Sequence, residues 1–146
     1  MKPVVIVEIE ICSSAERIFQ AWIDPEILCH WMFSPAVRDE SIIHLNCDAR
    51  PGGRFSFLVN RNQMLIDHVG EYQIVNEPTE LQFTWAIGQI TGNDSKVRVE
   101  IRQISEHCRL TIRHEMQPDW ADYIDRTRQG WEKMARSLKV FLESIN

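Results

Sequence analysis

The fold is decided by the last segment of the chain, residues 119–145, which reads DWADYIDRTRQGWEKMARSLKVFLESI. One stripe of side chains recurs there at intervals of three and four residues, the period of a helix with one buried face. The spacing predicts a single amphipathic helix of about seven turns, with Asp119 as its N-cap after Pro118. The stripe comprises Trp120, Ile124, Thr127, Trp131, Met134, Leu138, Phe141 and Ile145.

Ahead of this helix, residues from about 41 to 116 alternate between apolar and polar side chains, as strands with one buried face do. Turn residues such as Pro51-Gly52-Gly53 divide the region, and residues 4–11 alternate in the same way. Short loops favour antiparallel pairing of consecutive strands. The predicted strands are 4–11, 41–47, 53–59, 64–75, 80–87, 95–104 and 108–116.

Two short helices are expected between the first strand and the rest of the sheet. Ser13 and Glu16 match a capping box, in which each side chain accepts a hydrogen bond from a free amide at a helix start. Asp24 before Pro25 predicts the start of a second helix, which should end near Phe33. The element order therefore predicts an α+β fold in one domain, residues 1–146: a curved seven-stranded antiparallel sheet wrapped around a long C-terminal helix.

The dry, concave face of such a sheet should face the C-terminal helix. A curved sheet and a straight helix do not meet along their whole length, so we expect a cavity between them, lined by wide aromatic side chains. Trp31 should border its mouth, and Gly130 should allow the sheet or a ligand to approach beside Trp131. The alternative is that these side chains form a solid core. The candidate lining residues are Trp31, Phe55, Phe57, His68, Tyr72, Phe83, Trp85, His114, Thr127, Trp131 and Met134.

Several short motifs, taken in order, resemble one known family. They are Trp22 with DPEIL at 24–28 and Trp31, DARPGGRFSF at 48–57, GEY at 70–72, LQFTW at 81–85, IRHE at 112–115 and QGWE at 129–132. Over nearly its whole length the chain is similar to the START-like (SRPBCC) superfamily, and within it to homologues of the C-terminal domain of the heat-shock-protein-90 ATPase activator. The resemblance implies a helix-grip fold with a cavity and, usually, no established enzymatic residues. Because no second domain precedes this one in the sequence, we do not expect chaperone regulation to be its main function.

Composition and charge argue against several other classes of function. The net charge of -5, with dispersed basic residues, disfavours nucleic acid as a partner. No run of eighteen apolar residues is present, so we expect no membrane insertion. The N-terminus lacks the apolar region of a signal peptide, so we expect a cytoplasmic location. The four cysteines have no CxxC spacing, and His68 with His114 would lack a third metal ligand, so neither a metal nor another cofactor is expected.

Three hypotheses about function remain open at this point. In the first, the chain binds a small hydrophobic or aromatic molecule in the cavity and has no catalytic residues. In the second, it is a polyketide cyclase-like or hydratase-like enzyme in which His114 or His68 acts as general acid or base. In the third, it is an interaction module that docks a chaperone or forms a homodimer. For His114, a satisfied core histidine and a polar contact to a ligand are both open.

Overall fold

The computed structural model describes residues 2–145 and contains the elements that the sequence predicts. The strands are β1 (Val4–Ile11), β2 (Ser41–Cys47), β3 (Arg54–Arg61), β4 (Met64–Asn76), β5 (Glu80–Ile87), β6 (Ser95–Ile104) and β7 (His107–Glu115). The helices are α1 (Ala15–Ile23), α2 (Pro25–Trp31), the 3-10 helix η1 (Pro118–Tyr123) and α3 (Ile124–Ser144).

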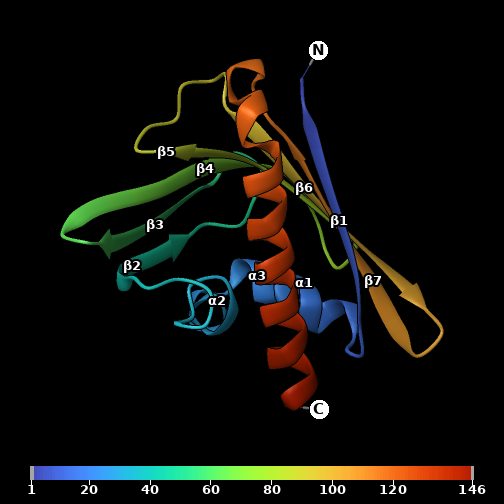
Figure 1. Ribbon diagram of the computed structural model, residues 1–146. Helices are drawn as coiled ribbons and strands as arrows, with labels where there is room; N and C mark the ends of the chain where they lie inside the picture. The colour runs from blue at the N-terminus through green and yellow to red at the C-terminus, as the bar shows by residue number, and fades with distance from the viewer. Residues whose placement is uncertain (1, 146) are drawn as a thin grey trace.

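The seven strands form one antiparallel sheet in the order β1-β7-β6-β5-β4-β3-β2. Consecutive strands from β2 to β7 are neighbours, as the short loops require, and β1 pairs with β7 at the edge. The sheet curves around α3, while α1 and α2 lie beside the lower half of that helix (Figure 1). The prediction of a curved seven-stranded sheet around a long C-terminal helix is therefore confirmed.

The two short helices form where the sequence places them, with one correction at the first. The N-cap of α1 is Ser14, whose hydroxyl accepts a hydrogen bond from the Arg17 amide at 3.2 Å. Ser13, the predicted cap, is instead buried, and its hydroxyl has no hydrogen-bond partner among the described residues. Asp24 caps α2 as predicted, because its carboxylate accepts from the Glu26 amide at 3.0 Å.

The C-terminal helix begins later than predicted. Asp119 does not cap an α-helix, because Pro118–Tyr123 forms a 3-10 turn and α3 begins at Ile124. Trp120 is consequently 55% exposed, and its ring packs against Tyr123 with centroids 5.2 Å apart. Ile145 follows the last helical residue and is also exposed. The buried stripe of α3 is thus shorter at both ends than the periodicity indicates.

Helix α3 approaches the sheet unevenly. Its backbone lies closest to β1 and α2, whereas β3, β4 and β5 lie farther from it. Wide side chains from those three strands fill the larger separation, which is where the sequence is richest in inward-facing aromatic residues. Among the described residues, no helix is both long and apolar enough to cross a bilayer.

Candidate functional site

Aromatic side chains form a continuous layer between the sheet and α3. We call this set the aromatic layer; it contains Trp22, Trp31, Phe33, Phe55, Phe57, His68, Tyr72, Phe83, Trp85, His114 and Trp131. All are buried except Trp85, which is half-buried. Of the other two predicted lining residues, Met134 is buried and Thr127 is half-buried on α3. Nine of the eleven predicted residues therefore belong to one network of ring contacts, and their role in lining a cavity stays a prediction.

A path of ring contacts crosses this layer from the sheet to the helices. Phe55 lies against Trp85 with centroids 5.7 Å apart, and Trp85 lies 6.1 Å from Trp131 on α3. Trp131 in turn lies 5.9 Å from Trp22 on α1, which meets Trp31 edge-on at 4.8 Å. Aromatic pairs at these separations are mutually attractive, so the layer joins the sheet to all three α-helices.

His114 is held in one protonation state by its two neighbours. The indole N–H of Trp131 donates to Nδ1 of His114 at 2.9 Å, and because an indole can only donate, Nδ1 carries no proton. The proton is therefore on Nε2, which lies 3.0 Å from the hydroxyl of Ser95. That hydroxyl donates to the Trp85 carbonyl at 2.9 Å. Burial lowers the pKa of His114 to about 4. These contacts make His114 a satisfied core histidine with neither nitrogen free.

His68 is also neutral, but among the described residues only one of its nitrogens has a hydrogen-bond partner. Its Nδ1 donates to the Phe57 carbonyl at 3.1 Å, so Nε2 is the unprotonated acceptor. Burial lowers the pKa of His68 to about 4, although the hydrogen bond to Phe57 opposes this shift. Its ring lies edge-on to Phe33 and tilted against Trp85. His68 thus offers the aromatic layer one hydrogen-bond acceptor.

The two tryptophans of the short helices differ in their hydrogen bonding. Trp31 is fully buried, and its indole N–H donates to the Ala21 carbonyl at 2.9 Å, so it joins α2 to α1 rather than bordering an opening. Trp22 is 3% exposed, and its indole N–H has no hydrogen-bond partner among residues 2–145. The sequence does not show which of the two indole N–H groups has a partner, because the acceptor of Trp31 lies on another helix and is brought near only by folding.

Two glycines differ in how closely other parts of the chain approach their backbone. A Cβ atom on Gly70 of β4 would lie 1.9 Å from the Thr84 carbonyl oxygen and 2.4 Å from Cε2 of Phe55, so the Phe55 ring packs directly on this glycine. A Cβ atom on Gly130 of α3 would meet nothing within 4 Å. The sheet therefore does not approach closely at Gly130, and the approach of a ligand beside Trp131 stays a prediction.

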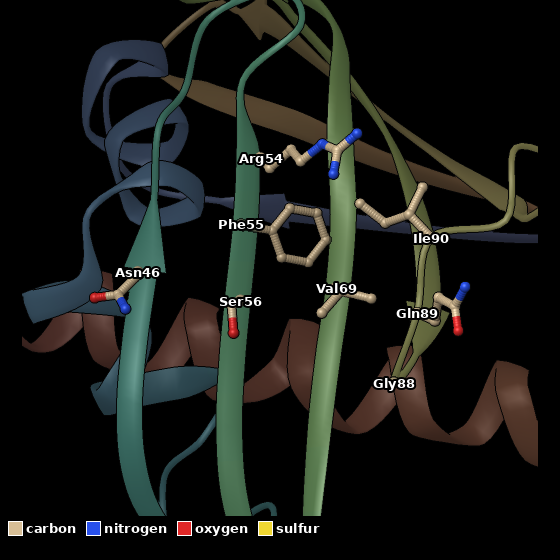
Figure 2. Close-up of a pocket in the computed structure, with 8 residues that line it drawn as sticks. All are labelled: Asn46, Arg54, Phe55, Ser56, Val69, Gly88, Gln89 and Ile90. Atoms are coloured by element: carbon tan, nitrogen blue, oxygen red, sulfur yellow. The ribbon is translucent and has the colours of Figure 1, made fainter.

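Two pockets open on other parts of the surface. The first, of about 560 Å³, lies on the outer face of β2, β3 and β4, with α3 on the far side of the sheet (Figure 2). Its lining residues are Asn46, Arg54, Phe55, Ser56, Val69, Gly88, Gln89 and Ile90. The second, of about 480 Å³, lies between residues 34–37 and α3. Of the predicted lining residues, only Phe55 borders either of these pockets, and a cavity inside the aromatic layer stays a prediction.

Polar side chains cross the outer face beside the first pocket without forming a catalytic triad. Nε2 of His44 lies 2.9 Å from the hydroxyl of Ser56, and that hydroxyl lies 2.7 Å from Oδ1 of Asp67. In a hydrolytic triad the histidine stands between the carboxylate and the serine, so that it can accept the serine proton. Here the serine is in the middle and donates to the carboxylate, so the arrangement does not activate a nucleophile.

A sheet that curves around one long helix, with two short helices after its first strand, defines the helix-grip fold of START-like proteins. A family model described as "Activator of Hsp90 ATPase homolog 1-like protein" matches residues 13–143, and the chain belongs to this family. No curated protein matches the chain.

Solved structures with the same fold come from several bacteria. A protein from Nitrosomonas europaea superposes with a TM-score of 0.82 at 18% identity, over 97% of this chain and 94% of the other. One from Rhodobacter sphaeroides gives a TM-score of 0.80 at 15% identity, over 97% and 95%. DynU16, from the dynemicin biosynthetic locus, gives 0.74 at 18% identity, over 96% of this chain and 47% of that one. At these identities the likeness shows the fold.

Proposed function

We propose that the protein binds a small hydrophobic or aromatic molecule within the aromatic layer, between the sheet and α3. The observation that carries this proposal is the indole N–H of Trp22, a buried donor without a partner among the described residues. A buried donor without an acceptor costs about 1–3 kcal/mol. A ligand with one acceptor atom would remove that cost on binding, and apolar rings around it would bury the rest of the ligand.

The surroundings of Trp22 suit such a ligand. Its ring lies among Trp31, Phe83 and Trp131, with centroids 4.8, 6.4 and 5.9 Å away. The backbone of α3 approaches the sheet most closely at β1, so side chains separate β3–β5 from α3. Entry of a guest therefore requires rings to turn aside, while the backbone can stay in place.

The geometry of His114 favours binding over cyclase-like or hydratase-like chemistry at that residue. A general acid or base must be within hydrogen-bond reach of the reacting atom. Both nitrogens of His114 are already engaged by Trp131 and Ser95. We therefore assign His114 to the support of the layer, and ligand binding is the function that these contacts support.

The test is a titration with paired ligands that differ by one acceptor atom. Naphthalene with 1-naphthol, and a medium-chain alkane with its alcohol, are added while tryptophan fluorescence and the melting temperature are followed. A ligand at a hundred times its Kd stabilises the native state by about 2.7 kcal/mol, which raises the melting temperature by several degrees. We expect the oxygenated member of each pair to bind more tightly.

Two variants separate binding at Trp22 from general apolar adsorption. Trp22→Phe removes the donor and should abolish the preference for the oxygenated ligand. Trp120→Phe makes the same chemical change at an exposed tryptophan and should leave the preference intact. If no member of a broad panel changes fluorescence or melting temperature, the proposed function is wrong.

A further inference from the structure

A half-buried arginine lies against the aromatic layer. Arg38 comes from the connection between α2 and β2, and its side chain is only 16% exposed. Its guanidinium carbon lies 4.9 Å from the centre of the Phe33 ring, and its Nη2 lies 3.4 Å from the sulfur of Met134 on α3. Sequence reasoning did not select Arg38, because the polar run from Arg38 to Glu40 follows the second short helix and has the composition of a solvated loop.

The guanidinium of Arg38 has more donors than hydrogen bonds to its neighbours. Arginine carries five N–H groups. Among the described residues, its one strong acceptor is the Met32 carbonyl, which receives the Nε hydrogen bond at 2.9 Å. The thioether of Met134 is a weak acceptor. Oε1 of Glu40, which has no hydrogen-bond partner among the described residues, is 3.9 Å from Nη1, beyond hydrogen-bond distance. Arg38 is thus a half-buried cation whose nearest carboxylate does not take up its spare donors.

The charges around Arg38 do not balance. The Glu40 side chain is 5% exposed and forms a close ion pair with Arg61. Two arginines therefore share one carboxylate, which leaves this cluster one positive charge in excess. The same three charges act electrostatically on His68, a member of the aromatic layer. An anion at the edge of the layer would neutralise the excess, and it would be attracted more strongly there than in water.

We propose that Arg38 binds the anionic group of the ligand, so that the protein selects hydrophobic or aromatic acids over neutral molecules of the same shape. This inference rests on the proposed function, because it concerns the same aromatic layer. The planar guanidinium matches a carboxylate or sulfonate through two parallel hydrogen bonds. The ring system of the ligand would then extend past Phe33 and Met134 into the layer.

Two fluorescent probes with one ring system test this inference. 8-Anilinonaphthalene-1-sulfonate and N-phenyl-1-naphthylamine share an anilinonaphthalene skeleton, and only the first carries an anion. We expect the sulfonate to bind the wild-type protein more tightly than the neutral amine. Arg38→Met should weaken sulfonate binding by about tenfold or more, as expected for a charged hydrogen bond, and should change binding of the amine by less than about threefold.

Two further variants test whether the sulfonate binds at Arg38 or elsewhere on the protein. Arg54→Met removes an arginine that lines the outer-face pocket and should leave both affinities unchanged. Arg38→Lys keeps the charge but loses the planar fork, so sulfonate binding should be intermediate; this variant carries the test if Arg38→Met does not fold. Far-ultraviolet circular dichroism and melting temperature confirm folding in each case.

The outcomes separate this inference from the proposed function. If both probes bind equally and Arg38→Met changes neither affinity, the acid preference is wrong while ligand binding stands. If Arg54→Met weakens sulfonate binding instead, the anion sits on the outer face, which also overturns the inference. If neither probe binds the wild-type protein, the acid preference is wrong, and the titration with naphthalene, 1-naphthol, the alkane and the alcohol decides the proposed function.

Discussion

Replacing Trp131 by phenylalanine is the most direct test of the hydrogen-bond chain that we assign to the centre of the molecule. The change keeps an aromatic ring on α3 but removes the indole N–H that donates to His114. The Nδ1 atom of His114 then becomes a buried acceptor without a donor. The Ser95 and Trp85 hydrogen bonds on the other side of the imidazole are left in place.

The size of the effect follows from two losses. Leaving a buried acceptor unpaired costs about 1–3 kcal/mol. Trp131 is 2% exposed, so the volume lost on going to phenylalanine becomes a partly filled void, which adds about 1 kcal/mol. We therefore expect the free energy of unfolding to fall by about 2–4 kcal/mol in Trp131→Phe.

Urea denaturation at pH 7 measures this change. The control is Trp120→Phe, which makes the same substitution at a side chain that is 55% exposed, and should alter stability by no more than about 0.5 kcal/mol. If Trp131→Phe loses less than about 1 kcal/mol, or no more than its control, the hydrogen-bond chain does not stabilise the fold as we argue.

Nuclear magnetic resonance gives a second readout of the same contact. Burial lowers the pKa of His114 to about 4, and the Trp131 donor also occupies the nitrogen that a second proton would need. In Trp131→Phe that nitrogen is free to take a proton, so we expect the pKa of His114 to rise, while burial still holds it below its usual value. An unchanged pKa would contradict the assignment of Nδ1 as the acceptor.

The remaining predictions concern pH and two glycines. His68 and His114 have pKa values lowered to about 4, below the 6.5 of the unfolded chain, so the unfolded state binds more protons between these values. The free energy of unfolding should therefore fall as pH drops from 6.5 to 4, by up to about 3 kcal/mol per histidine; urea midpoints that stay constant over this range would contradict it. Gly70→Ala should destabilise the protein by more than about 3 kcal/mol, because the new methyl group would overlap the Thr84 carbonyl. Gly130→Ala has free space and a helical position, so it should raise stability by about 0.5–1 kcal/mol in thermal melts; a loss at Gly130 equal to that at Gly70 would show that the packing is misassigned.

The sequence predicts a helix or strand well where a short local pattern is enough to specify it. Alternation in residues 4–11 and 95–104 marks β1 and β6, and Asp24 before Pro25 marks the start of α2. The sequence does not fix the start of α1, because Ser13 and Ser14 are both good N-caps, and in the structure Ser14 is the one that accepts from the Arg17 amide. The stripe on α3 predicts its buried face but does not distinguish an α-helical turn from the 3-10 turn at Pro118–Tyr123.

The alternation and the helical spacing of the apolar residues are enough to place the aromatic side chains of an antiparallel sheet on the face toward one long helix, because strand and helix periods fix which side chains share a face. Which polar atoms meet there depends on the packing of distant segments: Trp131 meets His114, Trp31 meets Ala21, and the Trp22 indole N–H has no partner among residues 2–145. Periodicity places a side chain on a face to within several ångströms, whereas a hydrogen bond requires about 3 Å and a suitable angle. The twist of the sheet and the unequal approach of α3 determine those distances, and they also bring Arg38 to the edge of the aromatic layer.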